Sequence, residues 1–275
     1  MSDLPDLLQL TEVGERRYHV FQPAEAAEGR DVVFSGQLLG QMMMASDLHA
    51  GGKDIRSVHA VFARAGSYLA PIEVEVESLQ AGRTWASDTV TARQNGKLLA
   101  RATVLLTVVD EDLMRHGPAM PVVPGFDELA PATGQAFPGA EIRPVPGAPM
   151  TGDVPVESAW HRFDRSLGSP AANRAVLSWA TCGQLIGLAM RPHAVDVRQA
   201  HRTLNTGVIG HTLHFLDRFD VDRPLLITQE ATKAATGRVY GQGSVFTADG
   251  ELVAAFHQDA MAKASPAALD PRTAM

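Results

Sequence analysis

Hydrophobic and polar residues alternate along much of this chain of 275 residues, in two similar series. The clearest case is residues 72–77, Ile-Glu-Val-Glu-Val-Glu, which predict a strand with one buried and one solvent-facing side. The first half predicts strands near 17–22, 57–63, 72–79, 84–93 and 98–109. The second half predicts strands near 156–164, 207–215, 225–231, 238–247 and 252–261. Each half therefore predicts one leading strand and a later group of four.

An apolar stretch lies between the leading strand and the later strands of each half. Residues 36–50 (GQLLGQMMMASDLHA) place apolar side chains on most faces of a helix, which is typical of a buried helix. Residues 171–190 predict the matching helix of the second half. Ser169-Pro170 is a start signal for it, and Arg191-Pro192 is a stop signal.

Short motifs also recur in the same order in both halves. Ser35–Gly40 (SGQLLG) returns as Cys182–Gly187 (CGQLIG), and Gly82-Arg83 returns as Gly237-Arg238. The predicted hairpin turn Asn95-Gly96 returns as Asp249-Gly250. Three motifs at nearly constant spacing predict that one fold unit is present twice.

A proline-rich segment separates the two units, since residues 110–150 contain 8 of the 17 prolines. This composition predicts a connector and excludes a sheet interior. The predicted domains are an N-terminal unit at 1–110, the connector at 111–150, a C-terminal unit at 151–265 and a tail at 266–275. A long buried helix followed by a curved antiparallel sheet is typical of the hotdog fold, whose open edge two units can cover for each other. We therefore predict an α+β double hotdog.

Composition narrows the class of protein. The net charge of −7 argues against a general nucleic-acid binder, although it leaves an anionic ligand open. Cys182 is the single cysteine, so no intramolecular disulfide can form. We find no signal peptide, no apolar run long enough to cross a bilayer, and no metal, phosphate-loop or nucleophile-elbow motif. These features predict a cytoplasmic enzyme or binding protein without metal or cofactor.

Several motifs together resemble the TesB-like type II acyl-CoA thioesterases. They are FSGQLLGQ at 34–41, RAG at 64–66, QNGK at 94–97, LSWAT at 177–181, RPH at 191–193 and Gln258. The resemblance covers about residues 30–110 and 155–262. It implies a double hotdog that hydrolyses the thioester of acyl-coenzyme A. In that family an aspartate on the second helix, a threonine on the next strand and a glutamine on the last strand position the attacking water.

The resemblance can be carried over position by position. The family glutamine is matched by Gln258, which implies that this amide holds the water. The aspartate position falls on Cys182, and the threonine position falls on Val208. A further family aspartate falls on Gly210. The usual set of three polar groups is therefore not complete in this chain.

The residues themselves suggest where other polar groups could come from. Backbone N–H groups of Gly36 and Gln37 at the helix start could bind the thioester oxygen, or Gly36 could simply allow close packing. On a regular strand Thr206, Val208 and Gly210 share one face with Thr212 and His214. Thr206 or Thr212 could then supply a hydroxyl, and His214 could be a base. A shift of one residue would reverse this set.

Four residues have two interpretations each. Cys182 could be a catalytic thiol or a small buried hydrophobic residue. His59, whose repeat counterpart we take to be His211, could act near the thioester or be an ordinary core residue. Arg64 could bind the phosphates of coenzyme A or be a solvated loop charge. Gln258 could also be a satisfied polar residue of the sheet, and alternation places His257 and Asp259 on the opposite face.

Hydrolysis of acyl-CoA is the function that these observations favour. One alternative is an acyl-CoA-binding protein that lost catalysis through Cys182 and Val208. Another is a hotdog hydratase or dehydratase, which would need a carboxylate–histidine pair. Acyl-CoA is the expected partner, and exposed sheet faces favour a homo-oligomer.

Overall fold

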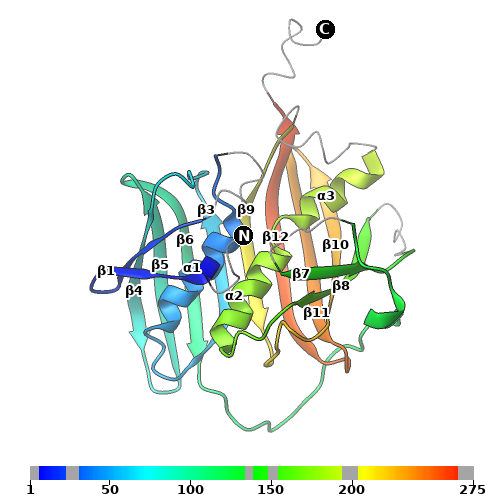
Figure 1. Cartoon of the computed structure of the whole chain (residues 1–275), viewed down its shortest axis with the longest axis horizontal. Helices are drawn as coiled ribbons and strands as arrows, with labels where there is room; N and C mark the ends of the chain where they lie inside the picture. The colour runs from blue at the N-terminus through cyan, green and yellow to red at the C-terminus, as the bar shows by residue number, and fades with distance from the viewer. Residues whose placement is uncertain (1–5, 23–30, 134–138, 148–153, 194–203, 266–275) are drawn as a thin grey trace, which may run out of the picture.

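The computed structural model describes residues 6–22, 31–133, 139–147, 154–193 and 204–265. Within them all strands belong to one antiparallel sheet of twelve, in the order β1-β2-β4-β5-β6-β3-β9-β12-β11-β10-β8-β7. Two halves of six strands meet at β3 and β9, which gives the predicted α+β double hotdog (Figure 1). Among the described residues, no helix is long and apolar enough to span a membrane.

The N-terminal half contains β1 (Thr11–Gly14), β2 (Arg17–Val20), α1 (Ser35–Asp47), β3 (Asp54–Phe62), β4 (Ile72–Ala81), β5 (Trp85–Gln94) and β6 (Lys97–Thr107). The C-terminal half contains β7 (Ala140–Pro144), β8 (Val156–Phe163), α2 (Pro170–Thr181), α3 (Gln184–Met190), β9 (Leu204–Phe215), β10 (Leu225–Ala235), β11 (Arg238–Thr247) and β12 (Leu252–Ala264). Every predicted strand has a counterpart here. The short edge strands β1 and β7 were not predicted.

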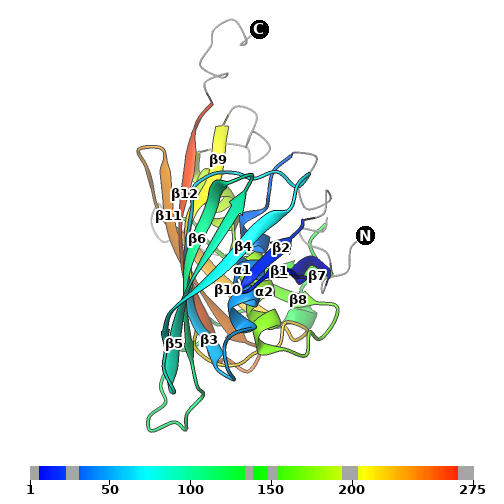
Figure 2. The ribbon, with the colours of Figure 1, turned by 90° about the vertical axis from the view of Figure 1, so that its left-hand side faces the viewer.

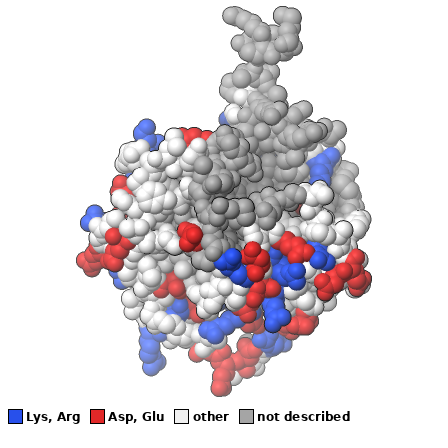
Figure 3. Space-filling view, in the orientation of Figure 1, with Lys and Arg blue, Asp and Glu red and all other residues white. Residues whose placement is uncertain are grey.

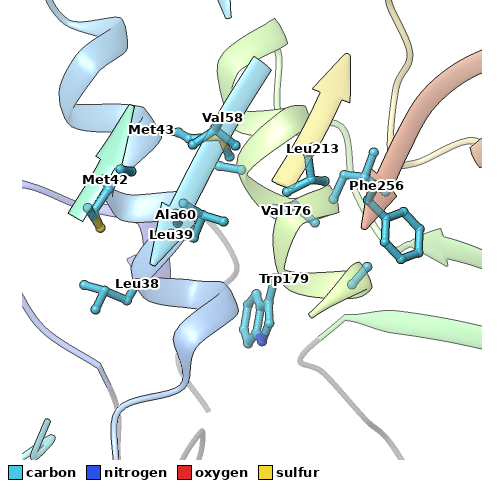
Figure 4. Close-up of a cluster of buried hydrophobic side chains, with 14 of the residues drawn as sticks. Leu38, Leu39, Met42, Met43, Val58, Ala60, Val176, Trp179, Leu213 and Phe256 are labelled. Atoms are coloured by element: carbon cyan, nitrogen blue, oxygen red, sulfur yellow. The ribbon is translucent and has the colours of Figure 1, made fainter. Parts of the chain in front are cut away.

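The helices cover one face of the sheet, which we call the inner face (Figure 2). Helix α1 contacts β3 to β6, α3 contacts β10 to β12, and α2 packs against α1 between them. In Figure 4, the side chains of Val58 on β3 and Leu213 on β9 lie among apolar side chains of α1 and α2, such as Met43 and Val176. These buried side chains form one core that continues from one half into the other.

The predicted helix at 171–190 is two helices. α2 ends at Thr181, and α3 begins at Gln184. Between them Cys182 is extended and Gly183 has φ of 92°, a left-handed conformation that glycine adopts without a steric penalty. The prediction of a continuous helix was wrong because apolar composition does not show where the backbone turns left-handed.

An ion pair also joins the two halves. Arg174 of α2 donates to Asp54 at the start of β3 over 3.0 Å, and its side chain is only 6% exposed. Arg218 contacts the same carboxylate over 3.1 Å. Elsewhere acidic and basic side chains are interspersed, as on the lower part of the face in Figure 3.

The proline-rich segment packs against the outer face of the C-terminal half. Phe126, which is 6% exposed, forms a second core with Trp160, Leu226 and Phe246. The guanidinium of Arg143 lies 4.1 Å from the centre of the Phe126 ring and donates to the Phe126 carbonyl. This segment also includes the edge strand β7. It therefore covers part of the sheet as well as connecting the two halves.

We expect Phe126→Ala to lower the free energy of unfolding by about 3 kcal/mol or more, the usual cost of emptying a buried aromatic site. Leu113→Ala is the matched control, because Leu113 lies in the same segment and is 98% exposed. Urea unfolding of both variants measures the difference. Equal stabilities would show that the segment is only a tether.

Candidate active site

Gln258 lies on the inner face of β12 and is 1% exposed. It sits opposite His211 of β9 on one side and Gly241 of β11 on the other. The neighbouring side chain of Asp259 is exposed and His257 is half-buried, because consecutive residues of a strand point to opposite faces. Gln258 therefore points toward the helices, as alternation predicts.

A chain of hydrogen bonds links Gln258 to the end of α2. Its Oε1 accepts from the Gly183 N–H over 3.3 Å, and its Nε2 lies 3.2 Å from His211 Nδ1. His211 Nε2 lies 3.1 Å from the hydroxyl of Thr181, which donates to the Leu177 carbonyl over 3.0 Å. The helix break at Gly183 is thus the feature that brings a backbone N–H to Gln258.

His211 is the site residue whose place sequence reasoning missed. It is completely buried, and burial lowers its pKa to about 3. The imidazole is therefore neutral at physiological pH. The sequence did show a histidine in a predicted strand that also contains Ile209 and Leu213. Alternation alone could not show which face of that strand points to the helices, because the strand contains a bulge.

A bulge in β9 changes which side chains face the site. Gly210 lies opposite Asp259 and Val208 opposite Ala260, so Ile209 is an extra residue. Val208 and Thr206 consequently face inward with His211, whereas Gly210 faces outward. The prediction that Gly210 shares a face with Thr206 and Val208 was wrong because one added residue reverses the alternation.

His59 lies on the outer face of β3 and is exposed. It faces Thr212 across the β3–β9 junction and hydrogen-bonds its hydroxyl. A bulge between Ile55 and Ser57 corresponds to the bulge in β9 and makes Thr212, not His211, the counterpart of His59. The structure therefore does not bring His59 to Gln258.

The inner counterparts in the N-terminal half are apolar. Val58 occupies the place that corresponds to His211, and its partner Val104 on β6 occupies the place of Gln258. Both valines are buried. In the part of the chain that the structure describes, the polar pair is therefore not repeated at the matching place of the N-terminal half.

Cys182 lies in the helix break and is 2% exposed. Its Sγ is 3.3 Å from the Ser35 hydroxyl, and burial raises its pKa to about 12. A Cβ added to Gly36 would lie 2.7 Å from the Cys182 Cβ, so Gly36 permits the start of α1 to approach α2 closely. The repeat-related residues Ser35 and Cys182 thus meet where the two halves join.

The other predicted residues lie around this point. The Gln37 side chain is buried and donates to the Leu7 carbonyl over 3.1 Å, so it points to the N-terminal segment. Arg64 is exposed in the bend after β3, at the end of the β3–β9 pair where Val208 and Thr206 lie. Gly183, Thr206 and Val208 are half-buried, so the site approaches solvent on this side.

The chain is similar in sequence to known acyl-CoA thioesterases. Residues 23–107 match the family model described as acyl-CoA thioesterase N-terminal domain, and residues 140–262 match the model described as acyl-CoA thioesterase. Acyl-CoA thioesterase 2 of Haemophilus influenzae is 23% identical over 96% of this chain and 98% of its own length. Human acyl-coenzyme A thioesterase 8 is 24% identical over 91% of this chain and 85% of its own length.

Solved structures show the same fold. The acyl-CoA thioesterase II TesB2 of Mycobacterium marinum superimposes with a TM-score of 0.83 at 24% identity, over 96% of this chain and 99% of the other. A tesB protein of Mycobacterium avium subs paratuberculosis gives a TM-score of 0.80 at 26% identity, over 96% and 100% of the two chains.

The Cys182 thiol should be chemically inert in the native protein. A buried thiol with a raised pKa is almost wholly protonated at neutral pH, so we expect iodoacetamide to modify it only after unfolding. Cys182→Ala should keep catalysis within about threefold of the wild type, since no covalent step then depends on the thiol. Rapid alkylation that abolishes catalysis would instead identify a nucleophile.

The buried histidines predict acid sensitivity. Burial lowers the pKa of His211 to about 3 and that of His161 to about 4. As the pH falls below about 6.5, these two histidines bind protons in the unfolded chain but not in the native protein. Each histidine therefore lowers the free energy of unfolding by up to about 1.4 kcal/mol for each pH unit. Urea unfolding between about pH 7 and 5 should show a shallower slope for His211→Asn and for His161→Leu. If both variants kept the wild-type slope, the acid sensitivity would not come from these two histidines.

Proposed function

Because this chain belongs to the TesB-like type II acyl-CoA thioesterase family, we propose that it hydrolyses the thioester of acyl-coenzyme A to a free acid and coenzyme A. The observation that carries the proposal is the place of Gln258. This amide lies on the inner face, tied to the helix break, beside half-buried positions that approach solvent.

Hydrolysis needs a water molecule fixed near the carbonyl carbon of the thioester. Gln258 uses one N–H toward His211 and one oxygen lone pair toward Gly183. One N–H and one lone pair remain, which suffice to orient a single water molecule. In this proposal Val208, opposite Ala260, borders that water, and Thr206 lies one inward position farther along β9, opposite Ala262, at the rim of the site.

The oxygen of the thioester carbonyl becomes negatively charged as the water attacks. The first intrahelical hydrogen bond of α1 is made by the Leu38 N–H to the Phe34 carbonyl, over 3.1 Å. The N–H groups of Gly36 and Gln37 precede it and have no partner within the helix. They lie beside Cys182, next to Gly183, so the start of α1 can stabilise the oxyanion through its N–H groups and its dipole.

The covalent steps then balance without an acyl-enzyme. Water oxygen bonds to the carbonyl carbon, the carbon–sulfur bond breaks, and the departing thiolate of coenzyme A takes the proton. His211 is not the base, since its Nδ1 already faces Gln258 and its pKa is lowered by burial. Among the described residues, the hydrogen-bond partners of Gln258 include no carboxylate.

The main alternative is a protein that binds acyl-CoA without turnover. It is favoured by Cys182 and Val208 at the places where the family resemblance implies an aspartate and a threonine. A hydratase has weaker support, because the ring nitrogens of His211 face Gln258 and Thr181 rather than a carboxylate.

The proposed site occurs once per chain, since valines replace the polar pair in the N-terminal half. Arg64, exposed at the same end of the junction, is proposed to contact the phosphates of coenzyme A. A homo-oligomer and a cytoplasmic location remain predictions.

Thiol release from acyl-CoAs of short to long chain tests the proposal. We expect the wild type to turn over at least one of them and Gln258→Ala to lose about a hundredfold in kcat, because the water is no longer positioned. Gln242→Ala is the matched control, since Gln242 is exposed on the outer face of the adjacent strand.

Each outcome of this assay has a distinct meaning. Binding of acyl-CoA without thiol release would establish the alternative. Loss of enoyl absorbance with an intact thioester would indicate a hydratase. Equal activity of Gln258→Ala and Gln242→Ala would exclude Gln258 from the water site.

A further inference from the structure

We propose that His211 is a positioning residue that fixes the orientation of the Gln258 amide. This inference rests on the proposed hydrolysis and adds a residue that does not touch the substrate. It follows from the direction of each hydrogen bond in the chain from Gly183 to Leu177.

A backbone group at each end, the Gly183 N–H and the Leu177 carbonyl, sets the donor-to-acceptor direction of the hydrogen bonds between them. The Gly183 N–H can only donate, so the oxygen of the Gln258 amide must face it. The NH₂ group of Gln258 then faces His211 Nδ1, which must accept and therefore carries no proton. His211 is the Nε2–H tautomer, and it donates to the Thr181 hydroxyl. That hydroxyl in turn donates to the Leu177 carbonyl.

Each member of the chain thus has one orientation that satisfies all four hydrogen bonds. A cationic His211 would present an N–H to the NH₂ group of Gln258, which would break the chain. The Nδ1–H tautomer would likewise lose the contact with Gln258 and leave that N–H to the backbone of His257, with which the ring also interacts. Only the neutral Nε2–H form leaves the second N–H and the second oxygen lone pair of Gln258 pointing away from His211 and Gly183, where they can bind water.

The N-terminal half shows that the fold itself does not need this pair. At the corresponding place the buried residues Val58 and Val104 lie opposite each other in the same sheet. Burying an imidazole costs free energy that a valine does not, so its presence beside Gln258 requires another reason. Orientation of the amide is a reason that the hydrogen bonds supply.

The test uses two substitutions at one position. His211→Val copies the residue of the N-terminal half and removes the acceptor for Gln258. His211→Asn can place an amide oxygen close to the position of Nδ1, so it keeps that acceptor but does not reach Thr181. We expect His211→Val to lower kcat about ten- to a hundredfold with little change in KM, as for a misplaced catalytic group. His211→Asn should recover kcat to within about threefold of the wild type, since the amide is again oriented.

His59→Val is the control for replacing a histidine of the adjoining strand, because His59 lies on the outer face. Circular dichroism and thermal unfolding show whether each variant is folded. Equal kcat for His211→Val and the wild type would overturn the inference. Equal losses in the valine and asparagine variants would show a structural role only, and would also overturn it.

A second readout separates this inference from the proposed hydrolysis. In ¹⁵N spectra of labelled imidazole groups, His211 should appear as the neutral Nε2–H tautomer, and its Nδ1 signal should move in Gln258→Ala. If the wild type releases no thiol, the proposed hydrolysis fails, and these spectra alone decide whether His211 holds the amide. An Nδ1–H tautomer or an unmoved signal would refute the contact.

Discussion

The pairing of β3 with β9 is the constraint on which the rest of this structure depends. Each of these strands lies at the edge of its own six-stranded half of the sheet. Without the pairing, both strands would expose a row of unpaired backbone N–H and C=O groups. The pairing also decides where the helices lie. It brings the start of α1 against the end of α2, where Gly36 allows an approach that a larger residue would prevent. A joined sheet and a close helix contact therefore create the place where Gln258 lies.

The two halves share a fold but not their chemistry. The bulges in β3 and β9 lie at corresponding positions, so the residues of the two strands still correspond one to one after them. The repeat-related residues Ser35 and Cys182 contact each other where the two halves join. At the place of the His211–Gln258 pair, however, the N-terminal half has the two buried valines Val58 and Val104. The helix break at Gly183 likewise belongs to the second half, where it supplies an N–H to Gln258. In the proposed hydrolysis, one half thus provides the residue that holds the water, and the other half provides the helix start that binds the thioester oxygen.

Much of the architecture could be predicted because it depends on patterns that survive in the sequence. The alternation of apolar and polar residues predicted the strands, and the repeated motifs predicted the two units. The same alternation predicted that Gln258 and Asp259 point to opposite faces of the sheet. Family membership is confirmed by the matched models. The Asn95-Gly96 hairpin is also confirmed, since both residues have positive φ, 50° and 73°.

The details of the site could not be predicted because each depends on the backbone conformation of a single residue or on a contact with a distant strand. The extra residue Ile209 reverses the faces of β9, which no local composition reveals. The left-handed Gly183 divides a stretch that is apolar throughout. Phe126 docks on the outer face because that face has an apolar patch, which becomes visible only when β8, β10 and β11 lie side by side. In each case the deciding partner is distant along the chain.

We propose that this chain has one acyl-CoA site, located at the His211–Gln258 pair of its C-terminal half. Calorimetric titration with an acyl-CoA analogue whose thioester is replaced by a non-hydrolysable thioether tests it most directly. We expect one molecule to bind per chain. Two equivalent molecules per chain would contradict it, because the valine-lined half would then bind as well.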